Sequence, residues 1–187
     1  MEKNGILQPS GCTSSSYWFA MRATYGRNIK AKSILEEKGI EVFVPMQYTI
    51  VVRNGKRKKL LMPVIKDLIF VHTTKASIQS AKADIPFLYY ITRPSQGKTI
   101  PLIVPHYQMK CFCDIASSDN DDVLFLVGDD CSIEKGARVR VVEGQFVGNE
   151  GYFMRVKGMR NRRFVVVLDN IIAVSVEIPS QFVEFIK

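Results

Sequence analysis

The chain of 187 residues contains few of the residues that build metal and redox sites. It has four cysteines and two histidines. No two cysteines are spaced as a C-x-x-C pair, and neither His72 nor His106 lies at a zinc-ligand spacing from a cysteine. We therefore expect no metal and no cofactor. We interpret the cysteines as free thiols in a reducing compartment: Cys12, Cys111, Cys113 and Cys131.

The sequence also lacks long apolar runs and the motifs of common enzymes. Its first residues are polar and rich in serine, so we expect neither a signal peptide nor a transmembrane span, and a cytoplasmic location. There is no glycine-rich phosphate loop, no nucleophile elbow and no histidine with an obvious carboxylate partner. These absences predict a protein that is not an enzyme.

Positive charge is in excess and unevenly distributed. Lysine and arginine number 26 against 18 acidic residues, a formal net charge of +8, which favours a polyanionic partner or an acidic protein surface. With 47% hydrophobic residues, the chain can still build a folded core. Two short basic segments flank an acidic block. The first contains Arg53, Lys56, Arg57, Lys58 and Lys59, the second Arg155, Lys157, Arg160, Arg162 and Arg163, and the acidic block Asp119, Asp121, Asp122, Asp129 and Asp130.

Residues 17–116 have the pattern of an α+β domain. Apolar periodicity and turn signals predict the order strand, helix, strands, helix, strand, helix, and Asn54-Gly55 is a strong hairpin signal. This order is that of a ferredoxin-like α/β sandwich. We expect a flexible leader at residues 1–16 and a linker at residues 117–132. The expected strands are 17–22, 42–44, 48–52, 60–62, 68–71 and 87–91, and the expected helices are 27–38, 75–83 and 105–116.

Residues 133–187 alternate apolar and polar residues in short runs between glycine turns, which predicts a compact antiparallel β module. Gly144, Gly148 and Gly151 stand where such a module needs a positive φ or a tight bend. The order basic strand, Gly-x-Phe-x-Gly-x-x-Gly, strand resembles the KOW motif of transcription and ribosomal proteins, which implies a small SH3-like β-barrel. An unrelated SH3-like barrel with the same turns is the alternative. The expected strands are 139–142, 152–156, 164–168, 171–176 and 182–186.

Nearly the whole chain resembles the NusG family of transcription elongation factors, in which an α+β domain precedes a KOW barrel. The resemblance rests on Tyr17-Trp18-Phe19-Ala20, Tyr25-Gly26-Arg27, Val44-Pro45-Met46 and the final segment 178–186. The first three are most similar to the UpxY antiterminators, specialised NusG paralogues of capsular polysaccharide operons in Bacteroides-type bacteria. The resemblance implies a monomeric bacterial factor, associated with the nucleoid through RNA polymerase, that suppresses pausing or termination on a polysaccharide operon.

The family docks on the clamp helices of RNA polymerase through an apolar surface that includes a Phe-Pro-Gly-Tyr segment. The corresponding residues here are Ile65-Lys66-Asp67-Leu68, so the apolar ends are kept and the middle is charged. By this resemblance the docking residues are Tyr25, Ile65, Leu68 and Phe70. Packing inside the sheet is the favoured alternative for Phe70, while for Tyr25 and Ile65 docking and packing stay equally open.

The basic segment around the hairpin tip is the main nucleic-acid candidate. Its cations are all of one sign and can follow phosphates on a mobile hairpin, with binding that weakens steeply as salt rises. Phosphate contacts do not read sequence, so a base reader is sought among Gln47, Tyr48 and Asn54. The alternative is a solvated edge that prevents sheet-edge aggregation. The five cations are Arg53, Lys56, Arg57, Lys58 and Lys59.

Two further motifs have both a functional and a structural interpretation. His72-Thr73-Thr74 is similar to a triplet with which one specialised relative contacts a polymerase loop, but its position favours an N-cap of the next helix by Thr73 or Thr74. In NusG relatives, the loop corresponding to Gly144, Phe146, Gly148 and Gly151 meets partner proteins, such as a ribosomal or termination factor. A core-filling role for Phe146 is the alternative.

The implied nucleic acid is non-template DNA or nascent RNA. A rival function is a KOW protein that binds ribosomal RNA and acts in translation. The α+β domain upstream of the KOW module argues against this rival.

Overall fold

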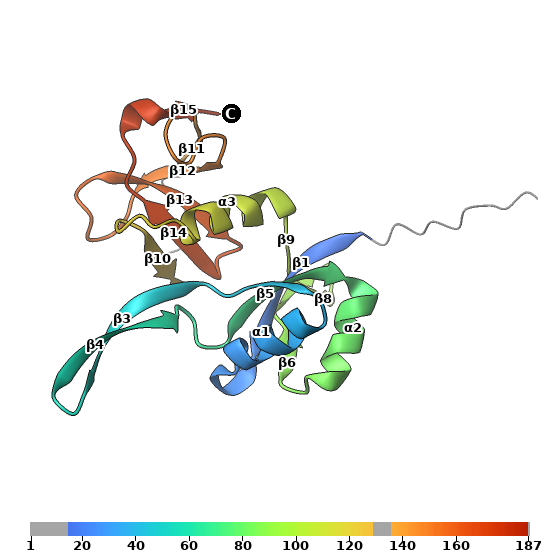
Figure 1. The fold of residues 1–187 in the computed structure, drawn as a ribbon. Helices are drawn as coiled ribbons and strands as arrows, with labels where there is room; N and C mark the ends of the chain where they lie inside the picture. The colour runs from blue at the N-terminus through green and yellow to red at the C-terminus, as the bar shows by residue number, and fades with distance from the viewer. Residues whose placement is uncertain (1–14, 129–135, 187) are drawn as a thin grey trace, which may run out of the picture.

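The computed structural model describes residues 15–128 and 136–186, which form two large antiparallel sheets with a helix between them and two separate two-stranded hairpins (Figure 1). An N-terminal α/β region is followed by an all-antiparallel β region, as the sequence predicted. Residues 1–14 of the expected leader, which include Cys12, lie outside the described residues. The same holds for Asp129, Asp130 and Cys131.

The central strand of the N-terminal sheet is β1 (Ser16–Ala23). It pairs antiparallel with β5 (Leu68–Thr74) along one edge, and with β6 (Leu88–Tyr90) and β9 (Ile103–Val104) along the other. The edge strand β2 (Glu41–Phe43) pairs with β5. The expected strands of this region are therefore present, and β9 is an addition to them.

Side chains of β1 and β5 alternate between two faces of this sheet, as the two-residue period of a strand requires. One face packs against α1 (Asn28–Glu37) and α2 (Lys75–Asp84), and the opposite face packs against α3 (His106–Ala116). The first face carries Phe19, Met21, Ile69 and Val71, and the second carries Trp18, Ala20, Leu68 and Phe70.

The three helices begin and end within about one or two residues of the predicted positions. Thr74 caps α2, because its Oγ1 accepts a hydrogen bond of 3.2 Å from the backbone N–H of Ser77. This bond confirms the capping interpretation of the His72-Thr73-Thr74 triplet. Pro105 precedes the first residue of α3, where a proline removes no helical hydrogen bond.

Two hairpins project from the N-terminal region. The predicted hairpin is β3 (Met46–Arg53) and β4 (Lys56–Pro63), joined by Asn54-Gly55 with φ of 50° and 72°. Lys56 to Lys59 belong to the second strand and do not extend the turn. A second hairpin, β7 (Thr92–Ser95) and β8 (Lys98–Pro101), was not predicted, because Pro94 and Pro101 argue against strands.

The C-terminal sheet has the order β10-β14-β13-β12-β11-β15, with every pair antiparallel. The expected strands are present, the last one being shorter because residues 180–182 form a 3-10 turn. Residues 124–127, inside the segment expected to be a linker, form β10 and pair with β14. The strand bounds are β10 (Leu124–Val127), β11 (Ala137–Val141), β12 (Glu150–Arg155), β13 (Arg162–Leu168), β14 (Ile172–Val176) and β15 (Val183–Phe185).

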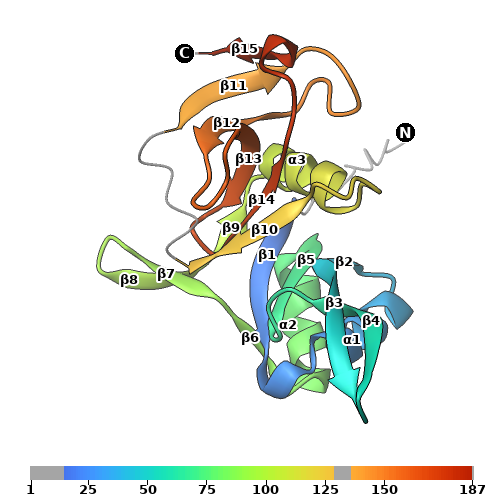
Figure 2. The same cartoon turned by 90° about the vertical axis from the view of Figure 1, so that its left-hand side faces the viewer.

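Helix α3 joins the two sheets into one hydrophobic cluster. Met109, Cys111, Phe112 and Ile115 are fully buried in a cluster that includes residues of both sheets. Figures 1 and 2 both show α3 running between the N-terminal sheet and the C-terminal sheet. The face of β1 and β5 that carries Leu68 and Phe70 is therefore covered in this structure.

Candidate nucleic-acid and partner interface

The β3–β4 hairpin presents a basic tip away from the rest of the molecule (Figure 1). Asn54 and Gly55 both have positive φ, the geometry of a two-residue turn that matches the twist of the flanking strands. All five predicted cations, Arg53, Lys56, Arg57, Lys58 and Lys59, are exposed, and none of them has an acidic partner within the described ranges. This tip can therefore contact an anion without breaking an existing ion pair.

The register of the hairpin divides its side chains between two faces. Arg53 pairs with Lys56, and Val51 pairs with Lys58, on one face; Val52 pairs with Arg57, and Ile50 pairs with Lys59, on the other. The first face is thus richer in charge near the tip. Lys59 differs from the other cations, because its Nζ lies 4.6 Å from the ring centroid of Tyr48, in the range of a cation–π contact.

The second face of the hairpin carries an exposed apolar row that the sequence analysis did not identify. Tyr48, Ile50 and Val52 are more than half exposed, and Leu61 faces Tyr48 across the ladder. Alternation in β3 was the available signal, because Tyr48, Ile50 and Val52 are two residues apart, and the residues between and beside them include the polar Gln47, Thr49 and Arg53. Tyr48, one of the expected base readers, is thus accessible for stacking on a base. Asn54, another expected base reader, is exposed at the turn and accessible for hydrogen bonds.

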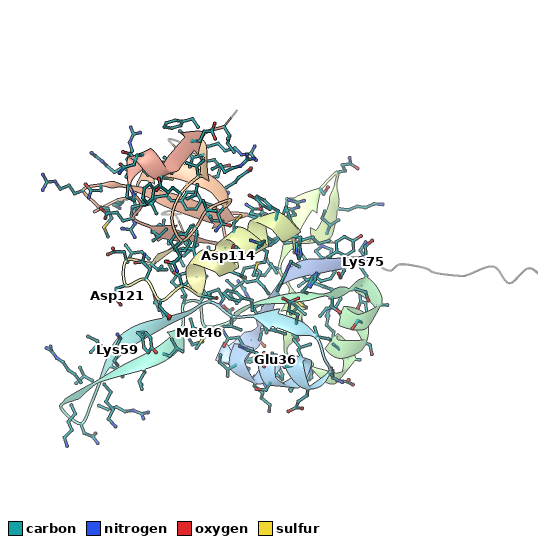
Figure 3. The ribbon with its side chains drawn as sticks, turned by 45° about the horizontal axis from the view of Figure 1, so that its top comes forward. Glu36, Met46, Lys59, Lys75, Asp114 and Asp121 are labelled. Carbon is teal, nitrogen blue, oxygen red and sulfur yellow. The ribbon has the colours of Figure 1, made fainter. Side chains whose placement is uncertain are left out.

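An open groove of about 610 Å³ lies at the root of this hairpin. Gln47, Tyr48 and Lys59 line one wall, and the acidic segment with Asp119 and Asp121 lines the other. Figure 3 shows Lys59 on the hairpin and Asp121 on the neighbouring segment. The groove therefore offers both an aromatic ring and acidic groups, whereas the tip offers only cations.

The four predicted docking residues do not share one exposed surface. Tyr25 is 89% exposed, Ile65 is half-buried at the edge of the cluster under α3, and Leu68 and Phe70 are buried. The Phe70 ring packs near Phe112 of α3, with centroids 6.3 Å apart. Burial supports the packing interpretation of Phe70, and the docking role of all four residues stays a prediction.

The turn that carries Tyr25 lies against the turn that carries Ile65. Asn28 is fully buried, and its Nδ2 donates hydrogen bonds to the carbonyl oxygens of Ile65 at 3.3 Å and Leu68 at 3.2 Å. Asp67 forms an ion pair of 3.0 Å with Arg22. The charged middle of the altered Phe-Pro-Gly-Tyr segment thus contributes to local structure, which the sequence alone did not indicate.

Tyr25 has an unusual backbone. Its φ is 61°, a left-handed conformation that is uncommon outside glycine. Its ring is contacted by the guanidinium of Arg27, 5.1 Å from the centroid, and the same guanidinium lies 4.4 Å from the centroid of Phe87. An exposed aromatic side chain on a strained backbone is typical of a residue that contacts a partner, which is consistent with the docking role predicted for Tyr25.

Helix α3 also makes polar contacts with the C-terminal sheet region. Tyr107 Oη donates a hydrogen bond of 2.6 Å to the carbonyl oxygen of Gly148, and Gln108 Nε2 donates one to the carbonyl oxygen of Val167. Burial, together with the neighbouring Cys111 and Glu150, raises the pKa of Tyr107 to about 12. Gly148 and Val167 belong to the C-terminal region, and Phe70, which packs near Phe112 of α3, belongs to the N-terminal sheet, so α3 contacts both regions.

In the loop expected to meet a partner protein, Phe146 and Gly151 are buried, whereas Gly144 and Gly148 are exposed. Phe146 is 4% exposed and belongs to the main cluster, which supports its core-filling interpretation. Gly144 and Gly148 have φ of 88° and 87°, as expected. A Cβ on Gly151 would lie 2.5 Å from the carbonyl oxygen of Val165, so close strand packing requires glycine there. A partner role for this loop stays a prediction.

Other titratable groups serve the fold. His72 Nδ1 lies 2.7 Å from Glu41 Oε2, and the His72 ring stacks on Trp18 with centroids 4.9 Å apart. Burial raises the pKa of the Cys113 thiol to about 12. Within residues 15–128 and 136–186, no group of three or more His, Cys, Asp or Glu side chains is placed to hold a metal ion. Of the helices in that part of the chain, none has the length and apolar character needed to cross a membrane.

The chain is similar to known proteins of one family. A family model described as "Transcription termination factor nusG" matches residues 16–113, more than half of the chain. A solved structure titled "Domain interaction in Thermotoga maritima NusG" is similar over 92% of this chain and 98% of that chain, with 18% sequence identity and a TM-score of 0.41. No curated protein matches the chain.

Proposed function

Because this chain belongs to the NusG family of transcription factors, we propose that it binds the elongating RNA polymerase and suppresses pausing or termination. Family membership implies polymerase binding, and the protein is a transcription factor rather than an enzyme. The observation that carries the proposal beyond the family is the projecting β3–β4 hairpin, whose tip cations lack acidic partners in the described ranges. Such a hairpin suits a factor that holds both a protein and a nucleic acid.

The proposed mechanism is a shift between two states of the polymerase. The N-terminal region bridges the polymerase cleft and binds the closed clamp more tightly than the open or swivelled clamp that pausing and termination require. A ligand shifts such an equilibrium only by its difference in affinity for the two states. The hairpin adds phosphate contacts to non-template DNA or nascent RNA, which strengthen binding to the transcribing complex.

We assign the first polymerase contact to Tyr25 and Ile65. Their turns lie side by side, and Tyr25 is available without rearrangement. Docking through Leu68 and Phe70 requires α3 to leave that face of the sheet, because both side chains are buried beneath it. These two residues therefore belong to a later contact, if α3 and the C-terminal sheet separate from the N-terminal sheet on the polymerase.

We also propose the finer architecture and the operon-specific role. The N-terminal region is a ferredoxin-like α/β sandwich over residues 17–116, and the C-terminal region is a KOW-type SH3-like barrel over residues 133–187. The pairing of β10 with β14 favours a tether shorter than the expected 117–132. Similarity of Tyr17-Trp18-Phe19-Ala20, Tyr25-Gly26-Arg27 and Val44-Pro45-Met46 to UpxY antiterminators supports a role in the cytoplasm on a polysaccharide operon.

A binding experiment with the full chain tests the proposal. Purified elongation complexes are immobilised, and retention of the wild-type chain is compared with retention of Tyr25→Gly and of a matched surface variant, Lys30→Gln. We expect the wild type and Lys30→Gln to be retained equally and Tyr25→Gly to be lost. Absence of retention for the wild type would overturn the proposed function, and full retention of Tyr25→Gly would overturn the assignment of Tyr25.

A further inference from the structure

We propose that the turn between β12 and β13 is a second nucleic-acid site, which binds the phosphate backbone of a single strand through Arg155, Lys157, Arg160 and Arg162. These residues lie in the C-terminal sheet region, away from the β3–β4 hairpin in sequence and in the fold (Figures 1 and 2). The site goes beyond the proposed polymerase contact, because it requires no residue of the N-terminal region.

The turn keeps its basic side chains exposed to solvent. The backbone N–H of Met159 donates a hydrogen bond of 3.0 Å to the carbonyl oxygen of Val156, which closes a four-residue turn. Gly158, at the third position, has a φ of 81° and open space around it. The geometry leaves the chain between the two strands exposed, while Val156 before the turn is buried.

The register places two arginines of the same charge against each other. Arg155 of β12 pairs directly with Arg162 of β13, and both side chains are exposed. Like charges directly opposite in an antiparallel pair destabilise the sheet. Neither arginine has an acidic partner in the described part of the chain, nor do Lys157 and Arg160. An anion bound by both guanidinium groups would offset this repulsion.

Glu177, a carboxylate that contacts residues 161 and 163, is already engaged by other groups. Glu177 accepts a hydrogen bond of 2.6 Å from Asn161 Nδ2, and its Oε2 lies 3.6 Å from Nη1 of Arg163. Arg163 is only 3% exposed and also donates to Ser175 Oγ at 3.1 Å and to the carbonyl oxygen of Asp122. Of the five basic residues in this segment, Arg163 is therefore structural, and the other four are free to bind.

The composition of the turn favours a nucleic acid over an acidic protein. The centre of a protein interface is enriched in apolar and aromatic residues and depleted in charge. Here Met159, 38% exposed, is the single large apolar side chain exposed among residues 155–162. Interfaces with nucleic acid are more polar and much more positive. The Asn161 amide is engaged by Glu177, so the free groups of the turn are its cations, which we expect to contact phosphates; such contacts carry no sequence information.

The test measures binding of the full chain to a labelled RNA of mixed sequence and about 20 nucleotides, long enough for one small module, and to DNA of the same sequence. Affinity is followed by fluorescence anisotropy over a range of KCl concentrations. Three variants are compared: Arg155→Gln/Arg162→Gln, Lys157→Gln/Arg160→Gln, and the control Lys30→Gln/Lys98→Gln. Each lowers the net charge by two. Lys30 and Lys98 are exposed and have no ion pair in the described ranges.

We expect both turn variants to reduce the slope of log affinity against log salt by about 1.4 relative to the control, since each phosphate contact to a single strand contributes about 0.7. We expect Arg155→Gln/Arg162→Gln to melt at the same temperature as the wild type or higher, because the repulsion is gone. Loss on RNA and DNA alike supports a backbone site, and loss confined to one of them identifies the strand that is bound.

Slopes equal to the control in both variants would overturn the proposal and leave the turn as a solvated surface. The same variants are also titrated with polyglutamate, which stands in for an acidic protein. If they lose binding to polyglutamate but bind the RNA and DNA probes as the control does, the proposal is overturned in favour of an acidic protein partner. The outcome is independent of the proposed function, because retention of these variants on elongation complexes reports on the N-terminal contacts instead.

Discussion

The two lysines on the charged face of the β3–β4 hairpin provide a quantitative test of how the tip acts. Lys56 and Lys58 project from the face that also carries Arg53, and neither has an acidic partner in the part of the chain that the structure describes. If both bind phosphates of a single strand, their replacement by glutamine should lower the slope of log affinity against log salt by about 1.4, or about 0.7 for each contact. Over a fourfold rise in salt this difference amounts to about sevenfold in affinity.

The assay is binding of the full chain to single-stranded DNA, to RNA of the same sequence and to a reconstituted transcription complex, between low and moderate KCl. Lys30→Gln/Lys98→Gln is the matched control, because it removes the same charges from α1 and β8. We expect the variant Lys56→Gln/Lys58→Gln to show the flatter slope and an unchanged melting temperature. Equal slopes in the two double variants would refute the assignment of Lys56 and Lys58 to phosphate binding and would favour the alternative that the hairpin is a solvated edge.

Three further predictions concern docking, packing and alkaline stability. Tyr25→Gly should keep or raise the melting temperature, because glycine removes a left-handed strain of about 1 kcal/mol, while readthrough in a terminator assay falls; unchanged readthrough would contradict the docking role. Gly151→Ala should lower the free energy of unfolding by about 1–3 kcal/mol in a urea titration, since its Cβ would meet the Val165 carbonyl at 2.5 Å. Gly158→Ala is the control, and a smaller loss of stability in Gly151→Ala than in Gly158→Ala would contradict this prediction. Burial raises the pKa of the Cys113 thiol from 9.0 to about 12 in the folded protein. As pH rises from about 9 toward 12, the thiol ionises in the unfolded chain but not in the folded one, so the free energy of unfolding falls. Cys113→Ser should reduce this alkaline loss of stability, and an unchanged dependence of stability on pH would contradict the raised pKa.

The sequence predicted the elements whose signals are local. Gly39 ends α1, the Thr74 hydroxyl caps α2, and Asn54-Gly55 closes the hairpin, because each depends on the conformation of a few adjacent residues. The second hairpin was missed since Pro94 and Pro101 lie in its strands. Strand β10 was missed since the acidic residues before it indicate a linker, whereas its pairing with β14 is a long-range contact.

The candidate site was predicted in part. The basic tip follows from a run of cations after a hairpin signal, and the structure places those residues on exposed strands. The burial of Leu68, Phe70 and Phe146 depends on where α3 packs, and no local pattern determines that. The opposition of Arg155 and Arg162 needs the strand register, which turn length alone did not fix.

A single-round transcription assay tests the central claim most directly. Purified RNA polymerase transcribes a template with one intrinsic terminator, with and without the full chain, and the fraction of readthrough product is measured. We predict that the wild-type chain raises readthrough and that Tyr25→Gly does so far less at equal concentration. Unchanged readthrough with the wild-type chain, under conditions in which it is retained on the elongation complex, would contradict a role in suppressing termination.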